Sequence, residues 1–245
     1  MRVLFFFLLL LPGPARACSV ALVLAMDVSG SVSRAEYDLQ MTGLADALGD
    51  PLVSEALVNA QALVALVQWS GRSRQKVSIP WRAMETHEDV AALRDEVVGM
   101  RRAYRNYATA IGEVLDRAID LLGEAPRTCR RRVIDVSGDG ASNEGKRPHH
   151  VRARLAMEDI TVNGLAITGS EPNIVPYYRE RVLFGGDAFL EVAEGYGDYP
   201  RAIRRKLVRE VVQQVAGTEP ASPAAVLRPV TARGDGPWPS ARATR

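Results

Sequence analysis

VALVLAMDVSGS, residues 20–31, is an apolar run that ends in a group of polar side chains. The run does not alternate polar and apolar residues, which is typical of a strand buried on both faces of a parallel sheet. Asp27, Ser29 and Ser31 follow at its carboxyl end, where open parallel sheets place their binding sites. Carboxylate and hydroxyl oxygens favour a hard cation, so the stretch predicts a site for Mg²⁺, with Mn²⁺ or Ca²⁺ as alternatives.

Taken alone, this motif is more often an ordinary turn with a helix N-cap. Two other segments support the metal hypothesis. Residues 132–136 form a second strand-like run that leads into Asp139, and Thr109 lies near the start of an amphipathic helix that extends through Leu122. A second carboxylate therefore also follows the end of a strand.

Together these segments resemble the von Willebrand factor A domain superfamily. Its metal-ion-dependent adhesion site takes D-x-S-x-S from the first strand loop, a Thr from a later loop and an Asp after the fourth strand. The match, in the family's order, covers Asp27, Ser29, Ser31, Thr109 and Asp139. The phrases LAMDVSGS (residues 24–31) and RVIDVSGDG (residues 132–140) are also similar to DUF1194, a bacterial branch of exported proteins without an assigned activity.

The resemblance implies a protein-binding module in which the bound cation accepts an Asp or Glu from a partner protein. Ser29, Ser31 and, in one ligation state, Thr109 would offer neutral hydroxyls, while Asp27 and Asp139 hold charge nearby. Because few carboxylates bind the ion directly, it keeps an open position for the partner. The alternative is a structural exported domain whose metal only stabilises its loops. The sequence identifies neither the partner nor the oligomeric state.

The resemblance also implies a disulfide between Cys18 and Cys129. Cys18 lies nine residues before Asp27, and Cys129 lies ten residues before Asp139. In the resembled fold these strands are parallel neighbours, so both cysteines would lie at the opposite edge of the sheet, within bonding reach. Export to an oxidising compartment favours the bond, and two free thiols are the alternative.

The order of apolar runs predicts an α/β fold with a doubly wound, mostly parallel six-stranded sheet and helices on both faces. Strands are expected at residues 20–26, 63–67, 76–79, 132–136, 161–167 and 188–192. Helices are expected at residues 33–48, 52–59, 88–98, 110–122, 148–158, 175–181 and 200–215. The second and third strands form a predicted hairpin, which would supply the resembled family's single antiparallel edge strand.

The chain is predicted to have three parts. Residues 1–17 have the pattern of a secretory signal peptide with cleavage near Ala17, which predicts a periplasmic or secreted protein. Residues 18–216 form the von Willebrand factor A-like domain, and residues 217–245 form a flexible tail rich in Pro, Ala and Arg. A lipid anchor on Cys18 is disfavoured, because Arg16 fits the required motif poorly.

Charge and hydropathy narrow the classes of partner. The chain has 31 basic and 29 acidic residues, and loss of Arg2 and Arg16 with the signal peptide leaves 29 of each. This balance gives no support to nucleic-acid binding. No stretch after the signal peptide is apolar for long enough to predict a transmembrane segment.

No catalytic pattern is found, so an enzyme is not expected. A phosphatase of the haloacid dehalogenase type would need D-x-D, and Ser29 stands at the second carboxylate position. G-x-S-x-G, a P-loop and G-x-G-x-x-G after a strand are absent, and the chain has three His. A hydrolase with an unfamiliar site stays an alternative, and turnover that depends on Asp27 would be its mark.

Three residues near the motifs have two readings each. Asp135 lies an even number of residues before Asp139, so it could point to the same side and support the metal site. It could instead be a carboxylate of the strand edge that pairs with another residue. Asn143 and Glu144 could shape the rim of the site, although such residues are common in turns.

Overall fold

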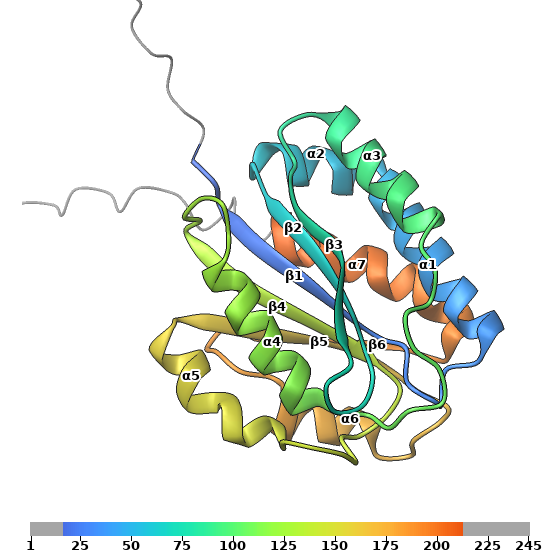
Figure 1. Ribbon diagram of the computed structural model, residues 1–245. Coiled ribbons are helices and arrows are strands. Elements are labelled where there is room, and N and C mark those ends of the chain that lie inside the picture. The colour runs from blue at the N-terminus through green and yellow to red at the C-terminus, as the bar shows by residue number, and fades with distance from the viewer. Residues whose placement is uncertain (1–16, 213–245) are drawn as a thin grey trace, which may run out of the picture.

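The sheet is built outward from its first strand. The structure is a computed structural model that describes residues 17–212, and its six strands lie in the order β3-β2-β1-β4-β5-β6 (Figure 1). The strands are β1 (Val20–Asp27), β2 (Leu63–Trp69), β3 (Gln75–Ala83), β4 (Arg131–Gly138), β5 (Ile160–Ile167) and β6 (Leu190–Ala193). Neighbouring strands are parallel except for β2 and β3, which form the predicted antiparallel hairpin at one edge. The predicted fold class is confirmed.

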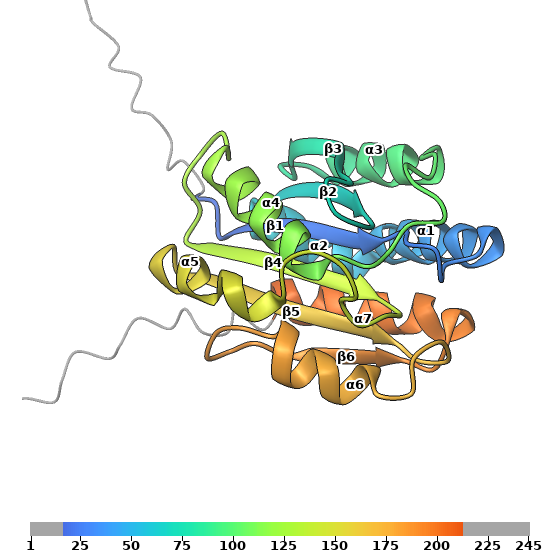
Figure 2. The same ribbon diagram turned by 60° about the horizontal axis from the view of Figure 1, so that its bottom comes forward.

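Helices cover both faces of this sheet. The helices are α1 (Arg34–Gly49), α2 (Pro51–Asn59), α3 (His87–Val98), α4 (Ile111–Gly123), α5 (Arg152–Met157), α6 (Ile174–Tyr177) and α7 (Tyr199–Val212). Helices α1, α2, α3 and α7 lie on one face, and α4, α5 and α6 lie on the other (Figures 1 and 2). Within residues 17–212, none of the helices has the length and apolar composition needed to cross a membrane.

Side chains of β1 alternate between two apolar cores, because successive residues of a strand point to opposite faces. The core beneath α1, α3 and α7 contains Val20, Leu22, Leu24 and Met26. The core beneath α4 contains Ala21, Val23 and Ala25. Every residue of β1 is buried, which explains why its sequence shows no polar alternation. Because β1 is packed on both faces, the position of Asp27 at its carboxyl end is fixed.

Four elements differ from the sequence prediction. The helix expected at 175–181 is α6 followed by a π-helical turn at Tyr178–Val182. The edge strand β3 is longer than expected and continues past Pro80 through irregular pairing, which an edge strand tolerates. The expected helix at 148–158 is a 3-10 turn (Pro148–Val151) followed by α5, and Arg147 provides no side-chain cap. The last strand begins at Leu190, because the backbone of Phe189 donates to the Asn163 side chain at 2.8 Å.

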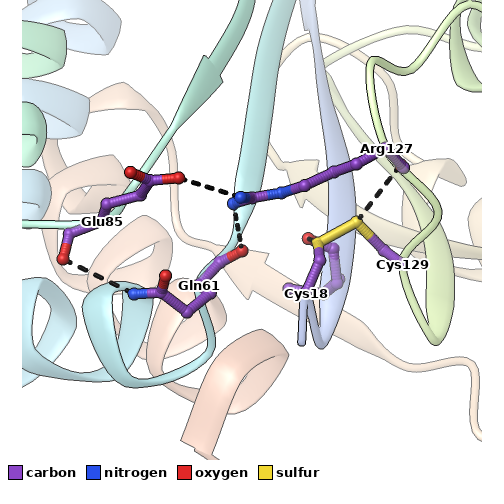
Figure 3. Close-up of a disulfide and its surroundings, with 6 residues drawn as sticks. Cys18, Gln61, Glu85, Arg127 and Cys129 are labelled. Atoms are coloured by element: carbon purple, nitrogen blue, oxygen red, sulfur yellow. Dashed lines mark hydrogen bonds and ion pairs between the residues drawn. A yellow bond between two sulfur atoms is a disulfide. The ribbon is translucent and has the colours of Figure 1, made fainter. Parts of the chain in front are cut away.

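A disulfide joins β1 and β4 at their amino ends. Cys18 and Cys129 are bonded, with their Cα atoms 4.6 Å apart, and each precedes its strand by two residues (Figure 3). Beside them, the Arg127 guanidinium donates to the Glu85 carboxylate at 2.9 Å and to the Gln61 carbonyl at 3.0 Å. The expected pairing is confirmed. The predicted signal peptide, except for Ala17, and the predicted tail lie outside the described residues.

Candidate metal site

The candidate site lies at the other end of β1 and β4, where three loops meet. Parallel pairing of Met26 with Ser137 places Asp27 beside Gly138, and Asp139 follows on the next loop. The loop before α4 reaches the same edge, because the backbone of Ala110 donates to the Ser70 carbonyl after β2 at 3.0 Å. The structure therefore gathers all five predicted site residues, although they are spread over more than a hundred residues of sequence.

Hydrogen bonds connect the side-chain oxygens of these residues. The Ser31 hydroxyl donates to Asp139 Oδ1 at 2.7 Å and lies 3.2 Å from Ser29 Oγ. The Thr109 hydroxyl donates to Ser29 Oγ at 3.3 Å. Asp27 Oδ1 accepts from the Ser29 backbone at 2.7 Å, so the first carboxylate folds over its own loop.

Backbone contacts fix the loop that carries the two serines. Arg102 Nη2 donates to the carbonyls of Val28 at 3.0 Å and Ser29 at 2.7 Å, and the Gly30 amide donates to the Tyr107 carbonyl at 2.7 Å. A Cβ atom on Gly30 would lie 3.2 Å from that carbonyl oxygen, so the close approach favours glycine. These contacts hold the serine loop in one orientation.

Thr109 is held by the loop that follows Asp139. Its amide donates to Asn143 Oδ1 at 2.9 Å, and its carbonyl accepts from the amides of Asn143 at 2.9 Å and Glu144 at 3.2 Å. Asn143 and Glu144 therefore connect two of the three loops. Glu144 also accepts from the Arg72 amide at 2.6 Å, which ties in the β2–β3 turn.

Asp27 is the most perturbed group of the site. It is fully buried, and its Oδ2 has no hydrogen-bond partner among residues 17–212. Burial, reinforced by the negative charge of Asp139, raises the pKa of Asp27 from 3.8 to about 7, although Ser29 and Arg102 oppose the shift. A Cβ atom on Gly138 would lie 2.8 Å from this oxygen and 2.8 Å from the Tyr178 hydroxyl. Only glycine leaves room beside the unpartnered oxygen.

The donor set fits a hard divalent cation. Hydroxyl and carboxylate oxygens are the kind of ligand that Mg²⁺ prefers. The contacts among Ser29, Ser31, Thr109 and Asp139 span 2.7–3.3 Å, so these oxygens lie close enough together to share one ion. Within the described part of the chain, no three His, Cys, Asp or Glu side chains are grouped so that they could hold a metal ion. A cation at this sheet edge would therefore take hydroxyl ligands beside the two carboxylates. Such a set suits Mg²⁺ better than Zn²⁺ or copper.

Sequence reasoning missed one side chain that touches the site. The Ser170 hydroxyl, three residues beyond β5, donates to Asp139 Oδ2 at 2.9 Å. The carboxyl end of β5 was a usable signal, because this strand pairs with β4 in parallel. Two tyrosine hydroxyls, of Tyr178 and Tyr196, also lie near the acids, and burial with the charges of Asp27 and Asp139 raises the pKa of both.

Asp135 does not support the site. Its Oδ1 forms an ion pair with Lys206 Nζ at 3.0 Å, and the same ammonium donates to Glu210 at 2.8 Å. Both partners come from α7, and all three side chains are buried. The paired-carboxylate reading of Asp135 is therefore correct, because its side chain points toward α7 and away from the loops.

Comparisons with known proteins give a family and a fold. The family described as "Protein of unknown function (DUF1194)" matches residues 17–215. A search of curated proteins gives no significant match. Among solved structures, the chain is similar to a von Willebrand factor type A protein from Catenulispora acidiphila. The two are 17% identical with TM-score 0.56, and the match covers 80% of this chain and 43% of the other.

Two further structures share this fold. Proximal thread matrix protein 1 from the mussel byssus, described with a zinc-occupied MIDAS motif, is 16% identical with TM-score 0.56 over 82% of this chain and 46% of its own. The pilus adhesin SpaC from Lactobacillus rhamnosus GG is 12% identical with TM-score 0.57 over 80% of this chain and 31% of its own. The chain thus spans less than half the length of each of these three structures. At these identities the likeness establishes the von Willebrand factor A fold.

Proposed function

This chain belongs to the DUF1194 family, and we propose that it is an exported module that binds a divalent cation and uses it to recognise a carboxylate of a partner protein. One observation carries the proposal. Three hydroxyls and two carboxylates from three loops converge at one sheet edge, and one buried carboxylate oxygen among them lacks a hydrogen-bond donor in the described residues. A cation would supply the missing positive charge.

Mg²⁺ is the proposed ion, held by Ser29, Ser31 and Thr109, with Asp27 and Asp139 acting directly or through water. When bound, it would supply a Lewis-acidic position for an Asp or Glu of the partner. Neutral hydroxyls leave more of its charge available than a cage of carboxylates would. The zinc-occupied MIDAS motif of the mussel protein and the adhesin role of SpaC support this class of function by analogy.

We propose export because the chain combines the sequence pattern of a signal peptide with the disulfide between Cys18 and Cys129. We propose no enzymatic activity. The hydroxyls of Ser29 and Ser31 contact each other, and that of Ser31 donates to Asp139. In residues 17–212 neither hydroxyl is hydrogen-bonded to a histidine base.

A binding measurement with a minimal probe tests the proposal. A fluorescent peptide with a single glutamate, dansyl-Glu-Gly-Gly-Gly-amide, is titrated with the purified protein in Mg²⁺ and in EDTA. We expect weak, saturable binding in Mg²⁺ that EDTA removes and that Asp139→Asn abolishes. Metal binding without any carboxylate binding would favour the alternative, a domain whose metal only stabilises loops.

A further inference from the structure

A groove opens beside the candidate metal site. It has a volume of about 650 Å³ and begins at Gly30, the residue between the two site serines. One wall is the start of α1, and the other is the segment that connects α3 to the Thr109 loop. A ligand that reaches the metal from this side must therefore pass along the groove.

Four arginines line this groove: Arg34, Arg101, Arg102 and Arg105. Arg102 donates from Nη2 to the serine loop, and burial, with repulsion from Arg105, lowers the pKa of Arg102. The other three are exposed, and none of the four forms an ion pair with a carboxylate of residues 17–212. Many other arginines of the protein do pair with acids, for example Arg82 with Glu96 and Arg204 with Asp50. The groove thus holds positive charge that the described chain leaves unneutralised.

The groove is not uniformly basic. Val32, Tyr37 and Met100 contribute apolar wall, and Asp38 stands at the rim as its single acidic residue. Ser33 and Asn106 add side chains that can hydrogen-bond to peptide groups. This mixture of charged, apolar and neutral polar surface offers contacts to peptide groups and side-chain carbon as well as to charge, which suits an extended peptide.

We propose that the groove binds an acidic peptide segment of the partner, in which one carboxylate reaches the metal and neighbouring Asp or Glu residues face the groove arginines. This inference rests on the proposed function and defines its partner. Arginine is suited to the role because its guanidinium pairs with carboxylates in a fixed, often bidentate geometry. The metal would give the attachment point, and the groove would give preference for an acidic sequence context.

The test compares two fluorescent probes, dansyl-Glu-Glu-Glu-Glu-amide and dansyl-Glu-Gly-Gly-Gly-amide, in Mg²⁺ and in EDTA. The groove variant is Arg34→Glu with Arg105→Glu. The matched control is Arg179→Glu with Arg181→Glu, which makes the same charge change at exposed positions after α6, on the other face of the sheet. In Mg²⁺ we expect the tetraglutamate probe to bind roughly tenfold tighter than the single-glutamate probe. The groove variant should lose this preference, and the control should keep it.

The other outcomes separate the groove from the metal. Equal, Mg²⁺-dependent binding of both probes, unchanged in the groove variant, would overturn the groove and leave the metal function standing. Salt-sensitive tetraglutamate binding that persists in EDTA and is lost in the groove variant would support the groove and contradict the metal function. A heparin tetrasaccharide that binds as tightly, with the same dependence on the groove arginines, would overturn the assignment to a peptide. Unchanged single-glutamate binding in the groove variant confirms that it is folded.

Discussion

The two ends of the strand pair β1 and β4 are held in opposite ways. At the amino ends, a covalent bond joins Cys18 to Cys129 and apolar core surrounds it. At the carboxyl ends, the contacts are hydroxyl hydrogen bonds, and two carboxylates lie close together with a buried oxygen left unpartnered. One end is optimised for stability, and the other carries polar groups whose mutual repulsion weakens the metal-free fold.

This difference assigns separate roles to the two ends. The disulfide fixes the spacing of the strands at a distance from the site, so the loops can hold Asp27 and Asp139 near each other without separating. Stability lost at the site is then offset elsewhere, which is common for functional sites. Variants at the amino end should therefore change stability alone, and variants at the carboxyl end should change metal binding as well.

The largest effect on stability is expected from loss of the disulfide. The bond closes a loop across 111 residues of sequence, and a crosslink of that length is worth about 5 kcal/mol in the chain-entropy description. Cys18→Ser with Cys129→Ser should lower the free energy of unfolding in urea by that order, while Mg²⁺ affinity of the folded protein stays within about twofold. A reductant should not destabilise the variant further. A loss below about 1 kcal/mol would contradict the role given to the amino end.

The next largest effect is expected at Gly138. A methyl group there would press on Asp27 Oδ2 and on the Tyr178 hydroxyl, each 2.8 Å away. Gly138→Ala should lower the free energy of unfolding by about 1–3 kcal/mol and reduce Mg²⁺ affinity at least tenfold. Gly123→Ala is the matched control, because a Cβ atom there meets nothing within 4 Å. Equal behaviour of the two variants would show that the space beside Asp27 does not matter.

Asp27→Asn should stabilise the metal-free protein at pH 8, by about 1–2 kcal/mol. Because the pKa of Asp27 rises from 3.8 to about 7 on folding, the folded state keeps a proton that the unfolded state releases. The stability that the protonated Asp27 side chain contributes is complete below about pH 4 and is lost as the pH rises through 7. The advantage of the variant should thus shrink at pH 5, as measured by urea unfolding. Asp46→Asn, at an exposed position of α1, is the control for the substitution itself. A destabilised Asp27→Asn at pH 8 would oppose the interpretation.

The smallest effect is expected at Ser170, which touches the site through Asp139 alone. Removal of its hydrogen bond in Ser170→Ala should weaken Mg²⁺ binding about fivefold, with little change in stability. Ser170→Thr keeps a hydroxyl and should retain most of the affinity. If both variants bind Mg²⁺ like the wild type, Ser170 has no part in orienting Asp139.

Local sequence was informative where function depends on the end of a strand. The apolar run before Asp27 and the shorter run before Asp139 predicted both strands, and parallel pairing then brought their loops together. The position of Cys18 and Cys129 relative to these strands, seen through the resemblance, predicted the disulfide. These features follow from periodicity and from the family order of the motifs.

Other features depend on contacts between distant segments that no local pattern records. Arg102 reaches the serine loop across 73 residues, and Ser170 reaches Asp139 across 31. The position of Asp135 in its strand could not show whether the side chain supports the metal site or pairs with another residue. The ion pair with Lys206 of α7 decides between the two. The groove arginines were likewise two separate groups in sequence, and only the fold brings Arg34 of α1 opposite Arg101, Arg102 and Arg105 beside the candidate site.

Calorimetric titration of the purified protein with Mg²⁺, beside Asp27→Asn and Asp139→Asn, tests the central claim most directly. The account predicts one saturable site per chain in the wild type and loss of binding in both variants, each with a folded circular dichroism spectrum. Absence of binding in the folded wild type, or binding that survives in both variants, would contradict a metal site at this edge of the sheet.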